Sequence, residues 1–185
     1  MPLSPHEEAD FRRWFGQSAV VGPRGRPKVV YHGTAGEPFS AFRPRINPKE
    51  QLGFGIHFTE DPEFASRYAH DARVVRSRKA VGRVIPVLLS VQTPLLADAI
   101  VVEGSPEFAL ARELAGKKLF ATHDMEDRLA TYLQGAIDRT SPARAERVIR
   151  AHGYDGVRYL SQLGEPTADG MKNVAGIFCA SSSFT

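Results

Sequence analysis

Two histidines, each within a short apolar segment, are the residues of this chain whose type and surroundings could do chemistry. His32 closes an apolar run and is followed by Gly33 and Thr34. Because glycine has no Cβ, a ligand can approach the backbone N–H and C=O of Gly33 closely. The His32 ring, the open backbone of Gly33 and the Thr34 hydroxyl lie together at one strand end. They are the hydrogen-bonding partners that a carboxamide and a ribose diol require.

The second histidine, His57, lies between Ile56 and Phe58. Successive side chains of a strand point to opposite faces, so Ile56 and Phe58 facing the core would leave His57 facing a cleft. Tyr68, on the helix predicted after this strand, could form one wall of a slot for a flat ring beside His57. The alternative for His57 is an exposed strand histidine without a ligand. The alternative for Tyr68 is a core residue whose hydroxyl contacts water.

The elements that must position these residues indicate an α+β domain, with strands at both ends and helices in the middle. The helix starts combine a capping residue with a proline at the first position, as in Ser4-Pro5. We expect helices near residues 4–15, 61–70, 106–115, 124–136 and 142–151, further strands at 83–91, 157–160 and 174–178, and loops at 35–52 and 161–173. Pro86 within one strand indicates an edge or a bulge.

Length and composition favour one soluble domain. The 185 residues fit a single unit, 1–185, with the helix in residues 1–18 packed on it through Phe11, Trp14 and Phe15. The net charge of +3 permits an acidic partner without requiring one. We predict no membrane span and no secretory signal, hence a cytoplasmic protein or one delivered into a target cell without such a signal.

Several common kinds of site are disfavoured by missing motifs. The chain has no glycine-rich dinucleotide fingerprint, no Walker loop and no nucleophile-elbow motif. With Cys179 as its only cysteine and no His-Glu-x-x-His motif, we predict no metal site.

The two histidine segments resemble those of PARP-like ADP-ribosyltransferases. The order is Tyr-His-Gly-Thr at 31–34, then Gly-x-Gly-Ile-x-Phe-Thr at 53–59, then Tyr68 ten residues after Phe58. Segments 11–18, 27–34, 82–95 and 153–157 look like the ADP-ribosyltransferase domains of phage and mobile-element polyvalent proteins. The resemblance spans about residues 11–95 and 146–180.

This resemblance implies a split, mixed β-structure with peripheral helices and NAD in a cleft. His32 would hold a ribose hydroxyl, Gly33 the nicotinamide carboxamide, and Tyr68 would stack on the nicotinamide. The remaining residues expected to line the NAD site are Tyr31, Thr34, His57, Phe58 and Thr59.

His57 departs from the family pattern, which has tyrosine at this place. A neutral imidazole can stack on the nicotinamide, whereas a protonated one opposes the cationic ring. We therefore predict that activity falls as the pH drops through the pKa of His57, whose ordinary value is about 6.5.

The acidic third residue of the family trio is also missing. It precedes the last strand in the family, where this chain has Asn173 and Val174. We expect Gln162 or Glu165 in the preceding loop to act in its place. The alternative is that both are ordinary polar loop residues.

The sequence thus predicts a mono-ADP-ribosyltransferase that moves ADP-ribose from NAD to a macromolecule, favouring a host protein over nucleic acid, as an effector or toxin. One alternative is a catalytically inactive NAD- or protein-binding module, which the missing acid motivates. Another is an NAD-dependent RNA 2′-phosphotransferase, which shares this fold. The basic residues Arg73, Arg76, Arg78, Lys79 and Arg83 could contact NAD phosphates or an acidic target, or simply form a solvated surface.

Overall fold

A computed structural model describes residues 3–35, 39–43, 46, 54–70, 81–120, 128–139, 141–160 and 174–178. Its helices are α1 (Pro5–Phe15), α2 (Pro62–His70), α3 (Pro106–Phe120), α4 (Leu129–Arg139), α5 (Pro142–Ala151) and the short 3-10 turn η1 (Pro23–Gly25). Its strands are β1 (Val30–Ala35), β2 (Ile56–Thr59), β3 (Gly82–Val87), β4 (Pro94–Leu96), β5 (Gly156–Leu160) and β6 (Val174–Phe178).

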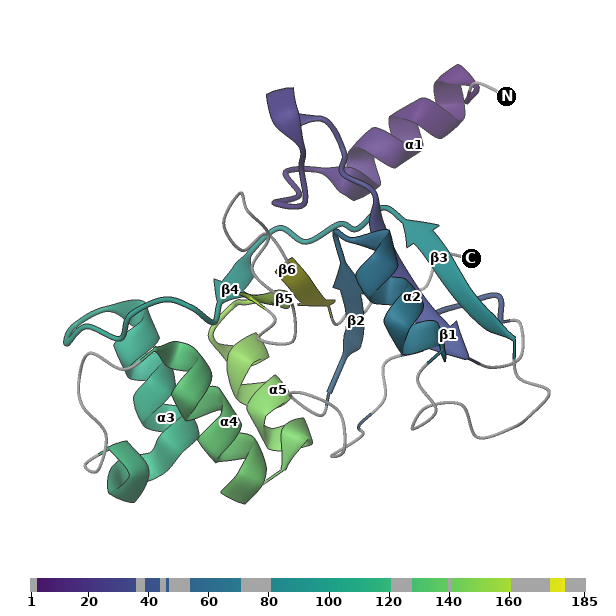
Figure 1. The fold of residues 1–185 in the computed structure, drawn as a ribbon. Helices are drawn as coiled ribbons and strands as arrows, with labels where there is room; N and C mark the ends of the chain where they lie inside the picture. Colours follow the sequence, from purple (N-terminus) through teal and green to yellow (C-terminus); the bar gives the residue numbers. More distant parts are fainter. Residues whose placement is uncertain are drawn as a thin grey trace.

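The described strands form one mixed sheet in the order β3-β1-β2-β6-β5-β4. All neighbours are antiparallel except β4 and β5, which are parallel. α2 lies against β1 and β3 and also reaches β2, whereas α3, α4 and α5 gather beside the β4 end of the sheet (Figure 1). This arrangement confirms the predicted α+β class.

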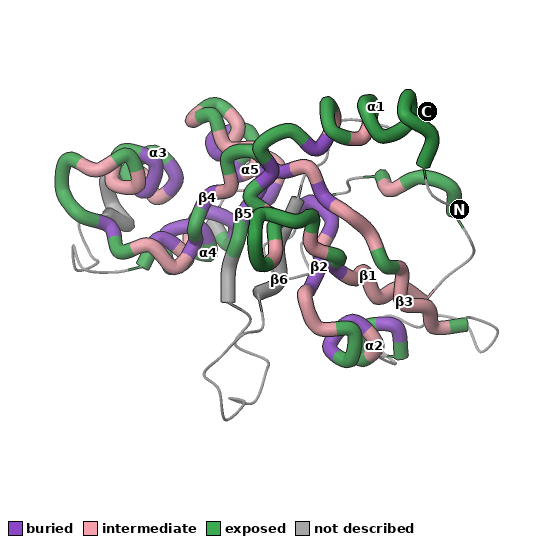
Figure 2. Tube along the Cα trace, turned by 90° about the horizontal axis from the view of Figure 1, so that it is seen from above, coloured by how far each residue is buried: buried purple, intermediate pink, exposed green. Residues whose placement is uncertain are grey.

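The helical group α3–α5 contains the larger apolar core. Leu110 on α3, Leu133 on α4 and Ala145 on α5 are fully buried together with Val157 of β5. Phe54, just before β2, belongs to the same cluster. Figure 2 shows the buried positions concentrated in this group and along the strands. The site strand β2 is therefore anchored at its start in the helical core.

A second, smaller cluster lies under the other half of the sheet. Val30, Ile56, Phe58, Leu89 and Val91 are its buried members. Since Val30 comes from β1 while Ile56 and Phe58 come from β2, one face of both site strands is core. This burial confirms that Ile56 and Phe58 point inward.

Helix α1 begins as its sequence predicts and extends away from the sheet (Figure 1). The Ser4 hydroxyl accepts from the Glu7 N–H, and the Glu7 carboxylate accepts from the Ser4 N–H. The bond that the Glu7 carboxylate accepts from the Ser4 backbone N–H, followed by its interaction with the Ser4 hydroxyl, lowers the pKa of Glu7. Only the last turn reaches the body of the protein, where Phe15 is buried and the Trp14 carbonyl accepts from the Ser90 hydroxyl.

Several elements differ from the sequence prediction. The strand expected at 83–91 is shorter, Gly82–Val87, and it is an edge strand, as Pro86 indicated. Helix α3 continues past residue 115 through a kink at Gly116, where φ is 68°. Strand β4 was not expected; it forms because a parallel ladder with β5 satisfies its backbone.

The helix expected at 124–136 begins at Leu129 in the described chain, and its predicted start lies outside the described residues. Where the chain is described, its helices are too short or too polar to cross a membrane.

Candidate active site

Strands β1 and β2 separate after a single recorded pair, Tyr31 with Thr59. β1 instead pairs along its whole length with β3, and β2 along its whole length with β6. Because the strands are antiparallel, the opening begins beyond this pair, at His32 on one side and Phe58 on the other, with Gly33 and His57 one position further on. This opening is the split that the sequence resemblance implied.

His32 bridges that split. Its Nδ1 lies 2.8 Å from the carbonyl oxygen of His57. A carbonyl oxygen only accepts, so Nδ1 carries the proton and donates. In the neutral ring Nε2 then holds the lone pair, which suits a hydroxyl donor such as a ribose. The two histidines therefore meet through the backbone of one and the ring of the other.

Aromatic rings on both sides fix the orientation of the His32 imidazole. Phe42 meets it edge-on, with centroids 5.2 Å apart, and Phe58 lies 5.6 Å away at a tilt. Phe42 also packs on Phe58 at 5.3 Å, and Phe39 packs on Phe42 at 5.0 Å. Sequence reasoning treated residues 35–52 as a covering loop and missed Phe39 and Phe42. Their spacing of three in an otherwise polar segment was the available signal.

His57 and Tyr68 lie on the other side of the sheet from the His32 ring. Since Ile56 and Phe58 point into the core, alternation turns His57 toward the face that α2 covers. Tyr68 is on α2, 39% exposed, with its ring edge-on to Phe64 at 5.4 Å. His57 and Tyr68, the two side chains expected to enclose a flat ring, thus lie on one face of the sheet. Gly33 lies in the neighbouring strand β1.

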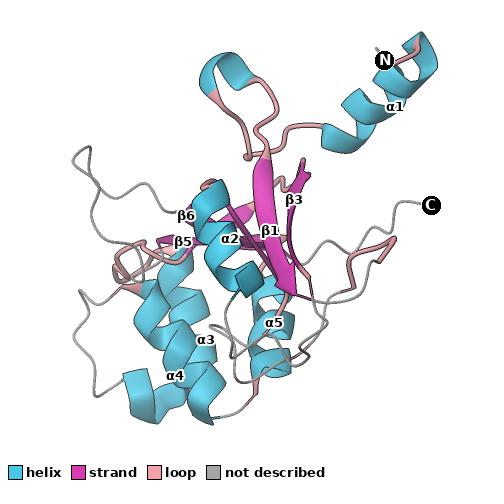
Figure 3. Ribbon diagram, turned by 45° about the vertical axis from the view of Figure 1, so that its right-hand side comes forward, coloured by secondary structure: helices cyan, strands magenta, loops and turns pink. Residues whose placement is uncertain are grey.

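Gly33 has a packing role in addition to the predicted ligand role. A Cβ on Gly33 would lie 1.8 Å from the carbonyl oxygen of Ala65 and 3.1 Å from the Cβ of Tyr68. α2 lies beside β1 (Figure 3), and its backbone comes closest to the strand at Gly33 and Gly82. The space above its Cα is therefore filled by the helix, and a ligand would reach the Gly33 backbone from the split.

The other expected NAD contacts fall on both faces. Tyr31 and Thr59 form the last pair before the split, and Thr34 lies opposite Arg83 of β3. Phe58 is buried against His32. The residues expected to bind NAD thus lie around one opening: residues 31–34 of β1 and residues 57–59 of β2. Their individual roles in binding NAD remain predictions.

The buried Thr59 and the following acidic residues start helix α2. The Thr59 hydroxyl accepts from the Asp61 N–H at 3.2 Å, and the Asp61 carboxylate accepts from the Glu63 N–H at 2.8 Å. Glu60, between them, is ion-paired with Lys28. The carboxylates nearest in sequence to His57 are therefore engaged in holding local structure.

The residue that replaces the missing acid is not placed. Gln162 and Glu165 lie outside the described residues, as do Arg73, Arg76, Arg78 and Lys79. β6 begins at Val174, paired with Leu160. The described part of the chain holds no group of three or more metal-ligating side chains.

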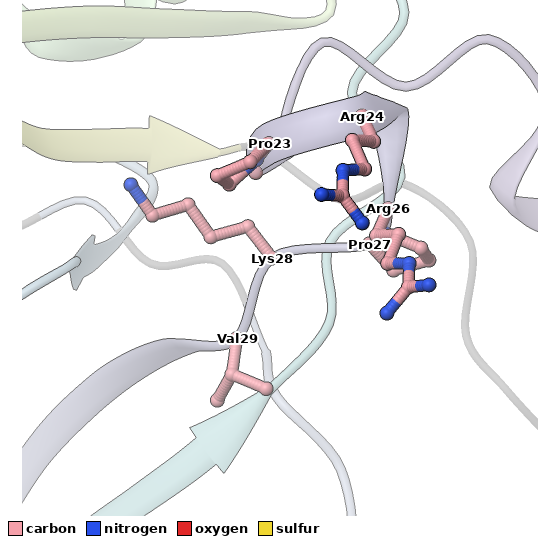
Figure 4. Close-up of a pocket in the computed structure, with 7 residues that line it drawn as sticks. Pro23, Arg24, Arg26, Pro27, Lys28 and Val29 are labelled. Atoms are coloured by element: carbon pink, nitrogen blue, oxygen red, sulfur yellow. The ribbon is translucent and has the colours of Figure 1, made fainter.

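A hollow of about 480 Å³ lies outside this opening, at residues 22–24 and 26–29 before β1 (Figure 4). Arginine, lysine, proline and valine line it. None of the predicted NAD-site residues does.

Comparison with known proteins agrees with the geometry. The family described as "ADP-Ribosyltransferase in polyvalent proteins" matches residues 23–178, which is most of the chain. No curated protein and no solved structure matches. The matched range contains both site strands, α2 and the whole described sheet.

Proposed function

Because the chain belongs to the ADP-ribosyltransferase family of polyvalent proteins, whose domains use NAD as co-substrate, we propose that it is a mono-ADP-ribosyltransferase acting on a protein. The observation that carries this proposal is the bridged split. One histidine ring, fixed by a 2.8 Å bond to the next strand, lies beside an opening whose other face carries His57 and Tyr68.

Each part of a bent NAD molecule would contact different residues of this arrangement. The nicotinamide ring would lie on the α2 side between His57 and Tyr68, with its carboxamide on the Gly33 backbone. The ribose would meet His32 at the split, where Nε2 of the neutral ring accepts from a hydroxyl. That bond strengthens as positive charge develops at the ribose carbon in the transition state.

The reaction breaks the bond between the ribose carbon and the nicotinamide nitrogen, and the electron pair leaves with nicotinamide. The acceptor nucleophile then forms a bond to the same carbon and loses its proton to solvent or a base. The products are neutral nicotinamide, ADP-ribosylated acceptor and one proton. Gln162 or Glu165 would orient the ribose or the nucleophile in place of the missing acid.

A single transfer is favoured over chain building, because the chain lacks the acid at the start of β6, where Val174 stands. We also propose that it acts on a host protein as an effector, which is compatible with its membership of the polyvalent-protein family.

The test is release of nicotinamide from NAD by the purified protein, alone and with bacterial lysate. We expect lysate to stimulate release and His32→Ala to lower it at least 100-fold, since one ribose bond and the bridge are both lost. His32→Gln, which keeps a donor and an acceptor, should recover part of the activity.

The position of His57 adds a pH test. Release by the wild type should fall between pH 8 and pH 5 as a stacked imidazole becomes cationic. His57→Tyr, which restores the family residue, should flatten this profile. A wild-type profile already flat over that range would contradict the stacking role.

Other outcomes would identify the alternatives. NAD binding without release would indicate an inactive binding module. Turnover only with 2′-phosphorylated RNA would indicate the RNA 2′-phosphotransferase. Neither binding nor release would refute the proposed cleft.

A further inference from the structure

Residues 22–28, which we call the cationic turn, form an ordered projection immediately before β1 (Figure 1). The Gly22 N–H donates to the Arg26 carbonyl at 2.8 Å, and the Gly25 N–H donates to the Gly22 carbonyl at 3.2 Å. An isolated bridge joins Val21 to Pro27. These bonds give the turn a fixed shape.

Arg24, at its tip, is held against its conformational preference. Its φ of 61° makes it the one residue other than glycine with positive φ in the described chain. The third position of a turn with positive φ favours glycine or asparagine, because an L side chain clashes with the backbone there. Glycines stand at 22 and 25, yet position 24 carries arginine. Such exceptions concentrate at functional sites.

The arginines of the turn differ from those of α1. Arg12 and Arg13 are each ion-paired with an acid one turn away, Glu8 and Asp10. For the guanidinium groups of Arg24 and Arg26, which are both exposed, the described chain offers no acidic partner and no hydrogen bond. The turn therefore presents two guanidinium groups to an outside anion.

Apolar surface lies beside these charges. Val21 is 38% exposed and Val29 is 44% exposed, and the hollow of about 480 Å³ is lined by both prolines of the turn. Arg24 and Arg26 lie at one side of this hollow, and Lys28 extends to the other (Figure 4). Arginine beside exposed apolar groups is typical of protein interfaces.

The base of the turn is fixed to the active site. Lys28 is ion-paired with Glu60, which directly follows β2. Arg26 is six residues before His32, so their Cα atoms are at most about 20 Å apart along an extended strand. A macromolecule resting on the turn can therefore reach the split.

We propose that the cationic turn docks an acidic segment of the protein acceptor. This inference rests on the proposed function and adds the chemistry of acceptor recognition. A protein fits better than a nucleic acid, because nucleic-acid binding normally neutralises many phosphates, whereas the turn has two uncommitted cations and an apolar floor. Guanidinium groups bind carboxylates with paired, charge-assisted hydrogen bonds.

The first experiment measures binding of a fluorescein-labelled decaglutamate peptide at low salt by anisotropy. Arg24→Gly with Arg26→Gln should weaken binding about tenfold. Arg147→Gln, an exposed arginine on α5, should change it less than twofold. Arg24→Gly alone should raise the Tm by about 2 °C, because glycine relieves the backbone conflict. If Arg24→Gly alone also binds the peptide more weakly while its Tm is higher, misfolding is excluded as the cause.

The second experiment separates docking from chemistry, using NAD labelled in its adenosine half with bacterial lysate. The double variant should hydrolyse NAD without lysate within twofold of wild type, while labelling of lysate proteins falls about tenfold. Free polyglutamate should inhibit labelling by the wild type.

Three results would overturn the inference. These are equal peptide binding by wild type and double variant, binding of duplex DNA in place of the peptide, or an equal loss of hydrolysis and labelling. If the wild type releases no nicotinamide at all, the proposed function fails, and the peptide result still decides whether the turn binds acidic protein.

Discussion

The two halves of the sheet are held together by different kinds of contact. Beside β4 and β5, the helices α3–α5 bury large side chains such as Leu110, Leu129 and Tyr132 completely. Beside β1 and β3, α2 approaches so closely that Gly33 and Gly82 have no room for a Cβ against its carbonyl oxygens. The helical half depends on side-chain volume, and the site half on backbone proximity. Small changes should therefore disturb chemistry in the site half and only stability in the helical half.

The largest loss of stability should come from the helical half. Leu110→Ala removes a fully buried side chain and should cost about 3 kcal/mol in the free energy of unfolding. Nicotinamide release, measured well below the Tm, should stay within twofold of wild type. Leu96→Ala, at an exposed position of β4, is the matched control and should cost less than about 0.5 kcal/mol. A large loss of activity in the folded Leu110 variant would show that the two halves are coupled.

Gly33→Ala should have the next largest effect on stability, and its effect on activity should exceed that of Leu110→Ala. Its Cβ would lie 1.8 Å from the Ala65 carbonyl oxygen, so α2 must move away from β1. We expect a cost of about 2 kcal/mol and at least a tenfold loss of nicotinamide release. Gly22→Ala is the control, since its new Cβ would find its nearest atom at 3.8 Å. Full activity in the Gly33 variant would refute the backbone-proximity argument.

The carboxylate that connects the start of β5 to the segment before β4 should contribute less. Asp155, just before β5, accepts from the Gln92 and Thr93 backbone N–H groups at 2.7 and 2.9 Å. Asp155→Ala removes both bonds and should cost about 1–2 kcal/mol in chemical denaturation. Asp155→Asn keeps one acceptor and should cost less. If the two variants are equally stable, the carboxylate does not hold this connection.

The smallest effect should come from the cap of α1, which lies outside both halves. Hydrogen bonds from Ser4 lower the pKa of Glu7, so the ionised carboxylate stabilises the folded state. This contribution is complete above the ordinary glutamate pKa and is lost as the pH falls through the lowered value. Glu7→Gln should reduce the Tm slightly at pH 7, and this difference should shrink as the pH falls below the ordinary glutamate pKa. A difference that stays constant across this acid range would assign the effect to packing.

Local signals were sufficient to predict much of the fold. The Ser4, Ser141 and Asp61 helix starts, the edge strand with Pro86 and the inward Ile56 and Phe58 all occur as expected. They follow from capping, from the missing N–H of proline and from strand alternation, which act over a few residues. Strand β4 was missed because its ladder is made by β5, about sixty residues away in sequence.

The site shows the same division between local and distant causes. Residue types and spacing alone pointed to His32, Gly33, His57 and Tyr68. The bond from His32 to the His57 carbonyl, the separation of their rings on two faces and the contact of Phe42 with His32 all join segments far apart in the chain. Such contacts depend on how the sheet opens between β1 and β2 and on how closely α2 approaches β1. No local pattern encodes either feature, because both are set by packing between elements.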